Sequence, residues 1–142
     1  MKNLILLTAV FCLALFASCK RGFQPIDYGK DACAHCKMTI MDKKFAAEIV
    51  DKKGKVFKFD DLLCMKDYVQ EHNLNSDELL VLVANFKNPD SDFLDVKNSF
   101  LLQSEAFKSP MNGHVAAFAS QMEATDVQNE TSARSIDWGS LK

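Results

Sequence analysis

The N-terminal segment constrains this chain more than any other part of the sequence. Lys2 is followed by an almost unbroken apolar run from Leu4 to Phe16, in which only Thr8 is polar. This run of 13 residues is shorter than the roughly 20 that a helix needs to cross a bilayer. A basic start, a short apolar run and small residues after it are typical of a secretory signal peptide. We therefore expect residues 1–18 to be removed and to take no part in the fold.

The small residues Ala17 and Ser18 lead directly into Cys19. The segment from Leu15 to Cys19 resembles the lipobox of bacterial lipoproteins, with Phe16 in place of the commoner Leu. We therefore expect Cys19 to carry a lipid that holds the chain to a membrane outside the cytoplasm, on the periplasmic side of a cell envelope. The alternative is a buried N-terminal helix, but no polar residue gives the run an amphipathic face.

Without the signal peptide, 124 residues remain, enough for one compact domain with a real core and too few for two ordinary ones. They carry 16 basic and 19 acidic residues, a net charge of −3. Because the basic residues alternate with acidic ones, the pattern indicates a solvated surface rather than a phosphate-binding stripe. We therefore do not expect a nucleic-acid partner.

The cysteines are odd in number once Cys12 is removed and Cys19 is acylated. Three thiols are left, those of Cys33, Cys36 and Cys64. In an oxidising compartment at least one of them cannot form an intramolecular disulfide. Such a thiol is expected to be reactive, buried or bound to something.

The mature chain divides by composition into three parts. Residues 19–30 contain a Gly, a Pro and few apolar residues, which indicates a short tether. We expect the folded domain to span 31–124. The polar residues 125–142 are expected to form a mobile tail, except where Trp138 docks.

Hydrophobic periodicity in the domain predicts the α+β class. In the first half, strands are expected at 45–50 and 55–59, joined by a turn, and a helix from about 62 to 72 follows the N-cap candidates Asp60 and Asp61. In the second half we expect a buried strand at 79–86 and two short strands at 93–96 and 99–103. A helix with an apolar side is expected at 114–124.

The segment from Cys33 to Met38 is the densest group of potential ligands. The thiols of Cys33 and Cys36 can converge on one atom, Met38 adds a thioether and His35 an imidazole. Thiolate and thioether ligands favour Cu(I), whereas structural zinc sites use four Cys or His ligands. Since there is no second Cys-x-x-Cys, the segment favours a soft metal over structural zinc. A disulfide or redox pair is the main alternative.

Two further segments contain candidate ligands. Met111 lies in a loop whose Pro and Gly can hold it out of the core, and His114 directly follows that loop. Cys64 falls in the first turn of the expected helix, a position that lowers a thiol pKa. The simpler interpretation of Cys64, a buried residue next to a helix cap, is preferred.

Several motifs together resemble one known family. In order, they are Cys33-x-x-Cys36-x-Met38-x-Ile40, Phe45-Ala46-Ala47-Glu48 with Gly54 and Val56, Phe59-Asp60-Asp61 with Cys64-Met65, and Ser109-Pro110-Met111 with Ala116-Ala117-Phe118. Their succession after a lipobox is similar to that of the NosL family of nitrous oxide reductase accessory lipoproteins. The similarity runs from about Asp31 to Phe118, most of the mature chain.

The resemblance implies a function, a fold and a set of ligands. The function is that of a Cu(I) chaperone, not an enzyme, that hands copper to nitrous oxide reductase or another copper enzyme outside the cytoplasm. The fold is a domain of two similar ββα-containing modules. The family's Cys-x-Met segment corresponds to Cys36 and Met38, and its later Met to Met111. Cys36 and Met111 are the first candidates for metal ligands, and Cys33 and His114 are further ones.

The chain departs from the family between Cys36 and Met38. The position is commonly Gly in the family and is Lys37 here, which loses backbone freedom and brings a cation near the site. Two rival functions also stay open. One is a thiol-disulfide oxidoreductase that uses Cys33 and Cys36. The other is a lipoprotein domain stapled by one structural disulfide, with its methionines buried as packing.

Overall fold

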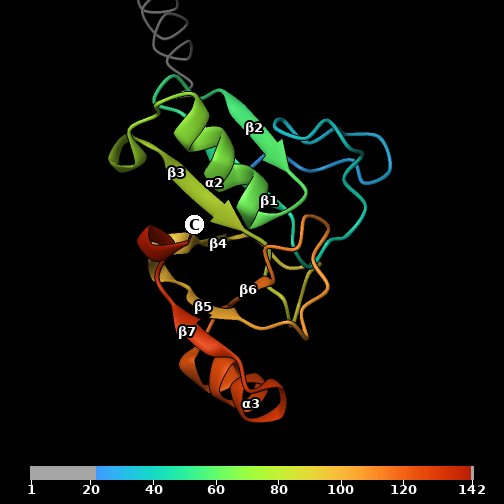
Figure 1. Cartoon of the computed structure of the whole chain (residues 1–142). Helices are drawn as coiled ribbons and strands as arrows, with labels where there is room; N and C mark the ends of the chain where they lie inside the picture. Colours follow the sequence, from blue (N-terminus) through green and yellow to red (C-terminus); the bar gives the residue numbers. More distant parts are fainter. Residues whose placement is uncertain (1–21, 142) are drawn as a thin grey trace, which may run out of the picture.

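The computed structural model describes residues 22–141 (Figure 1). The expected signal peptide and the expected lipid site at Cys19 lie outside the described residues, so both stay predictions. Within residues 22–141, no helix is long and apolar enough to cross a membrane.

The first module contains one helix and a four-stranded antiparallel sheet. Its elements are β1 (Ala47–Val50), β2 (Val56–Phe59), α2 (Leu62–Glu71), β3 (Leu80–Val83) and β4 (Leu94–Asp95). The strand order is β2-β1-β3-β4. The expected strands and helix of the first half are therefore confirmed, as are the first two strands of the second half.

The second module repeats this plan with a three-stranded sheet. Its elements are β5 (Phe100–Gln103), β6 (Val115–Phe118), α3 (Gln121–Thr131) and β7 (Arg134–Ile136), with the strand order β6-β5-β7. Each module contains the succession strand, strand, helix, strand, and in each the first of these three strands lies between the other two. The first module adds β4 at the edge of its sheet beside β3. The expected α+β class with two similar ββα-containing modules is thus confirmed. Short 3₁₀ helices occupy Ser76–Glu78, Val96–Asn98 and Trp138–Ser140.

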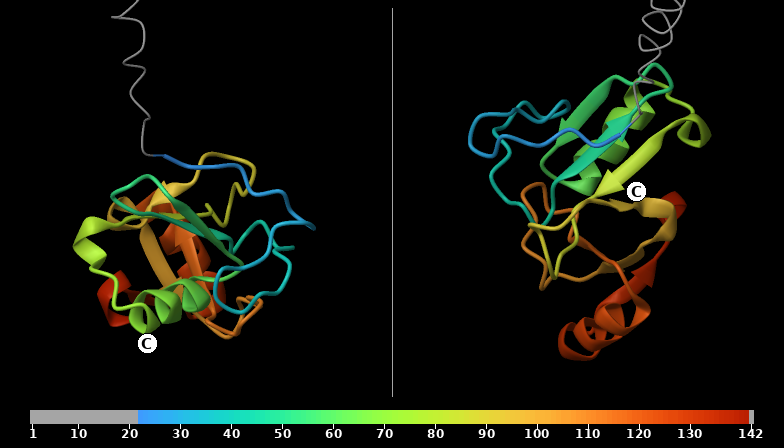
Figure 2. Two further views of the ribbon diagram at one scale, coloured as in Figure 1. Left: turned by 90° about the horizontal axis from the view of Figure 1, so that it is seen from above. Right: turned by 180° about the vertical axis from the view of Figure 1, so that it is seen from behind.

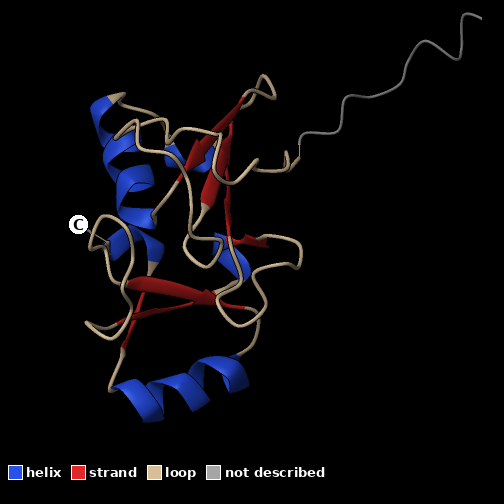
Figure 3. Cartoon of the chain, turned by 90° about the vertical axis from the view of Figure 1, so that its right-hand side faces the viewer, coloured by secondary structure: helices blue, strands red, loops and turns tan. Residues whose placement is uncertain are grey.

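The three-stranded sheet lies between α3 and the first module (Figure 3). One hydrophobic core lies on each side of this sheet. Leu101 of β5 packs into the core that is shared with α2 and the four-stranded sheet, whereas its neighbour Leu102 packs into the core beneath α3. This alternation follows from the period of two along a strand. The first core contains Phe59 and Met65 and surrounds the candidate site.

The expected helix at 114–124 is wrong. Residues Val115–Phe118 form β6, and all four are buried. The Val115 and Ala117 side chains pack into one core and those of Ala116 and Phe118 into the other, so burial on two faces outweighs the helix propensity of alanine. The helix α3 begins only after Ser120, whose side chain accepts the N–H of Glu123.

Packed residues also lie outside 31–124. Ile26 is buried, and the Lys58 ammonium donates to the carbonyl of Pro25 at 2.7 Å. At the other end, β7 pairs with β5, and Leu141 joins the first core. Both flanks therefore contribute to the fold.

Glu48 on β1 is a fully buried carboxylate. Its Oε2 accepts the N–H of Gln24 at 3.1 Å, while its Oε1 has no hydrogen-bond partner among the described residues. Burial raises the pKa of Glu48 to about 7. Because its strand neighbours Ala47 and Ile49 pack into the first core, Glu48 lies on the other face of the sheet, under the N-terminal segment.

The first prediction tests where α3 begins. Ser120→Ala removes the N-cap and should lower the free energy of unfolding by about 1 kcal/mol in urea titrations. Thr125→Ala, inside the same helix and exposed, is the control and should change it by less than about 0.5 kcal/mol. If a helix ran through position 120, alanine there would instead stabilise the protein.

The second prediction concerns pH. A folded-state pKa of about 7 lies above the ordinary value of 4.5, so the folded state binds more protons than the unfolded chain between these values, and the free energy of unfolding falls as the pH rises. Glu48→Gln should therefore flatten the decline between about pH 5 and pH 8, as measured by urea titration. Glu130→Gln, exposed on α3, is the control. An unchanged slope in the Glu48→Gln protein would contradict the assignment.

Candidate metal centre

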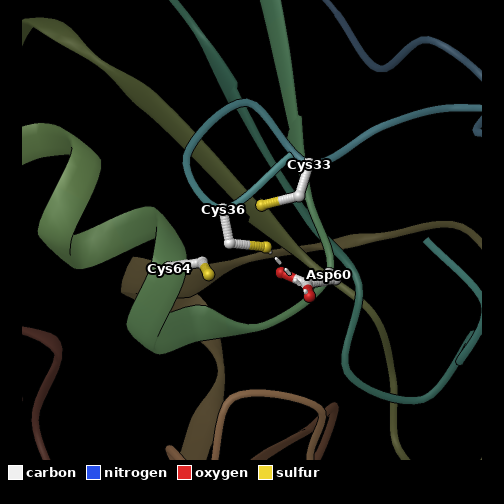
Figure 4. Close-up of side chains that lie close together, drawn as sticks. All are labelled: Cys33, Cys36, Asp60 and Cys64. Carbon is white, nitrogen blue, oxygen red and sulfur yellow. Dashed lines mark hydrogen bonds between the residues drawn. The ribbon is translucent and has the colours of Figure 1, made fainter. Parts of the chain in front are cut away.

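Three thiols and one carboxylate converge beside the start of α2 (Figure 4). Cys33 and Cys36 come from the loop before β1, Asp60 follows β2, and Cys64 lies in the first turn of α2. One ligand atom from each residue lies within 4.8 Å of the others. All three cysteines are free thiols in this structure. We call these four residues the thiol cluster.

The loop that holds Cys33 and Cys36 is a tight turn. The N–H of Cys33 donates to the carbonyl of Met38 at 2.8 Å, and the N–H of Lys37 donates back to the carbonyl of Cys33 at 3.1 Å. The N–H of Ala34 donates to the carbonyl of Lys58 in β2. The loop is thereby closed on itself and fixed to the sheet, which places both thiols against the start of α2.

The other half of the cluster depends on how α2 begins. Asp61 is the N-cap, and its Oδ1 accepts the N–H of Leu63 at 2.6 Å. The neighbouring Asp60 is therefore not needed as a cap, and its carboxylate points to the cysteines instead (Figure 4). Its Oδ2 accepts the Cys36 thiol at 3.5 Å.

The cluster is buried except at Cys36. The side chains of Cys33, Asp60 and Cys64 are at most 1% exposed, whereas Cys36 is only partly buried. Burial raises the pKa of Cys33 to about 11, and burial together with the charge of Cys33 raises the pKa of Cys64. Desolvation therefore outweighs the lowering of the pKa that a helix start favours, in agreement with the preferred interpretation of Cys64 as a buried residue.

The donor set fits a soft cation. The Oδ1 atom of Asp60 is buried and has no hydrogen-bond partner among the described residues. Such an atom is costly unless a cation or a donor satisfies it. Three sulfur atoms beside it are ligands that Cu(I) and Zn(II) accept, and a bound cation would stabilise the thiolates that burial disfavours.

Only some of the predicted ligands belong to the thiol cluster. Cys33 and Cys36 belong to it. Met38 is 45% exposed and is not a member of it. Met111 is half-buried against the first core, and its N–H donates to Asp61 Oδ2 at 3.2 Å, so its loop adjoins the start of α2.

His114 is not a member of the cluster. Its Nδ1–H donates to the carbonyl of Phe107 at 2.7 Å, and its Nε2 lies 3.3 Å from the Glu105 carboxylate. The His114 imidazole therefore contacts residues of its own loop and not the thiol cluster. His35, between the two thiols of the turn, is likewise engaged elsewhere, since its Nδ1 lies 3.3 Å from the Glu71 carboxylate on α2.

Asp60 and Cys64 are the members of the cluster that sequence reasoning missed as ligands. Both were assigned to the start of the helix, as a cap candidate and as a buried residue. A usable signal was present, because two successive acids precede α2 and a helix needs only one N-cap. Asp60, four residues before Cys64, is therefore free to contact another group, such as a thiol or a metal ion.

Comparisons with known proteins agree with the fold. The sequence profile of the NosL family matches residues 26–141. Among solved structures, the fold is similar to the crystal structure of the copper chaperone NosL from Shewanella denitrificans. The TM-score is 0.71 at 15% sequence identity, and the match covers 86% of this chain and 96% of that chain. No curated protein matches significantly in sequence.

The third prediction concerns the turn between the two thiols. Lys37 has a φ of 67°, in the left-handed region that costs other residues energy and glycine little. Lys37→Gly should therefore be more stable than Lys37→Ala by about 1 kcal/mol in urea titrations. The alanine variant is the control, because both lose the ammonium that donates to the carbonyl of Ala34. Equal stabilities would contradict the strain.

Proposed function

The chain belongs to the NosL family, and we propose that it carries Cu(I) outside the cytoplasm and delivers it to a copper enzyme. NosL is a family of copper chaperones, not of enzymes. One observation carries the proposal, namely the convergence of three sulfur atoms and one Asp60 carboxylate oxygen within 4.8 Å, where the Oδ1 of that carboxylate is buried without a hydrogen-bond partner among the described residues.

The chemistry of the cluster suits Cu(I) as a cargo. Thiolate and thioether ligands select Cu(I), and a cluster of three sulfurs needs little movement to bind one ion. Sulfur ligands at about 2.3 Å from a metal, as in zinc sites, lie roughly 4 Å apart around it when three are coplanar. The cluster span of 4.8 Å is close to that spacing.

The exposure of the sulfur atoms suggests how the ion is exchanged. Cys36 is partly exposed, and Met38, two residues further along the chain, is 45% exposed. Cys33 and Cys64 lie buried behind Cys36. We propose Cys36 as the central ligand, Cys33 and Cys64 as the inner ligands, and Met38 with Met111 as thioethers at the entrance. An acceptor can then displace the outer ligands one at a time.

His114 is left out of the proposed ligand set because its ring is engaged by Phe107 and Glu105. The receiving enzyme is proposed to be nitrous oxide reductase or another copper enzyme, on the strength of the sequence resemblance. The lipid on Cys19 would hold the carrier on the periplasmic side, where that enzyme matures.

The rival oxidoreductase is disfavoured by the thiols themselves. A catalytic thiol needs a lowered pKa, usually at a helix N-terminus or beside a cation. Here the pKa of Cys33 is raised to about 11, and the Cys33–Cys36 turn precedes a strand. The other rival, a domain stapled by one disulfide, predicts no affinity for Cu(I) even after reduction.

The fourth prediction tests the proposed ligands by anaerobic Cu(I) titration of the reduced, signal-free protein against a competing chelator. Cys36→Ser and Cys64→Ser should each weaken binding by more than the roughly 100-fold that loss of an outer-shell partner costs. Met38→Leu and Met111→Leu should weaken it less, by about 10-fold.

Met122→Leu is the matched control for the methionines, since Met122 is 73% exposed on α3. It should leave the affinity unchanged. If the Cys36→Ser protein held Cu(I) as firmly as the parent, the carrier site would be wrong. If only the Cys64→Ser protein did so, Cys64 would be removed from the proposed ligand set.

A further inference from the structure

Apolar side chains are exposed where the described chain begins. Phe23 is 42% exposed, and its ring centroid lies 4.8 Å from that of Phe93, in the loop before β4. Both rings line a shallow groove of about 210 Å³ with Pro25, Tyr28 and Pro89. Two aromatic rings together at a surface, one of them with 42% of its area exposed, are typical of a contact region.

This apolar region continues beyond the groove. Met41 is 69% exposed and lines a neighbouring depression with Lys44. Lys43 and Pro89 line both hollows, so the two are contiguous. We call this region the Phe23 surface, which consists of Phe23, Met41, Lys43, Lys44, Pro89 and Phe93.

The length of the tether limits what can cover this surface. Cys19, the proposed lipid site, precedes Phe23 by four residues, and four residues span at most about 14 Å when fully extended. A lipid on Cys19 would therefore keep Phe23 within the headgroup region of the bilayer. We infer that the Phe23 surface rests on the phospholipid bilayer, with Phe23 and Met41 inserted among the headgroups. This inference rests on the proposed lipid anchor.

The charges around the surface favour apolar insertion over electrostatic binding. Lys43 is paired with Asp90 at 2.7 Å, and Asp42 and Asp92 lie on the same rim. The lysines therefore bring little net positive charge. Aromatic and thioether side chains can enter the interface of a zwitterionic bilayer, where lysine stems also lie favourably.

This contact would orient the thiol cluster. The N-terminal segment crosses the face of the four-stranded sheet that carries Glu48, and Gln24 donates to that carboxylate. The helix α2 and the thiol cluster lie on the opposite side of the sheet (Figure 2). With the Phe23 surface on the bilayer, Cys36 is turned away from the membrane and toward soluble partners.

Tryptophan fluorescence tests the inference, because Trp138 is the single tryptophan of the chain. In a Trp138→Phe background, F23W is placed in the full-length, processed protein and reconstituted into phosphatidylcholine vesicles with and without brominated acyl chains. M122W in the same background is the matched control, since Met122 is exposed on α3. We expect a blue shift and quenching by brominated lipid for F23W and neither for M122W.

Mass spectrometry of the same samples separates the inference from the proposed anchor. If the protein carries the lipid and F23W is quenched no more than M122W, the surface assignment is overturned while the anchor stands. If the protein carries no lipid and F23W is still quenched, the anchor fails and the surface stands. Without lipid and without quenching, both fail. None of these outcomes affects Cu(I) binding by the thiol cluster.

Discussion

The carboxylate of Asp61 is the contact on which the site depends. One of its oxygens caps α2 through the N–H of Leu63, and the other accepts the N–H of Met111 from the second module. The cap sets where α2 begins and hence where Cys64 points. The second bond holds the Met111 loop against that start, and Gly113 fits there because a Cβ would lie 2.6 Å from Asp61 Oδ1. One buried side chain thus aligns two proposed ligands, Cys64 and Met111, that are 47 residues apart in the sequence.

Burial gives the thiols two opposing properties. A raised pKa keeps Cys33 a neutral thiol at ordinary pH, which protects it from reaction with oxidants that attack thiolates. A metal reverses this preference, since its charge compensates for desolvation and the thiols release their protons on binding. Loading of the proposed Cu(I) would accordingly be coupled to proton release. The partly exposed Cys36 is the natural point of first contact.

Local patterns predicted the parts of the structure whose signals are local. The sequence predicts the hairpin of β1 and β2, the start of α2 and the loop of Cys33 and Cys36. Turn residues, helix caps and residue spacing act within a few positions, so a short stretch of sequence contains the whole signal. The roles of Asp60 and Cys64 were not predicted, since they depend on a loop 24 or more residues away. The error at Val115–Phe118 has a similar origin. Alanines favour a helix locally, and only the burial of both strand faces between two cores overrides them.

The two modules share one strand order, yet they differ in what they contribute. The first module contains all four residues of the thiol cluster, whereas the second contributes the Met111 loop that leans on the start of α2. The two modules therefore have different roles. One contains the thiol cluster, and the other supports the start of α2 beside that cluster. The two modules are also joined where the backbone N–H of Phe86, three residues after β3, donates to the carbonyl of Ala117 in β6. Changes in the second module can therefore alter the position of the start of α2, and with it Cys64, in the first module.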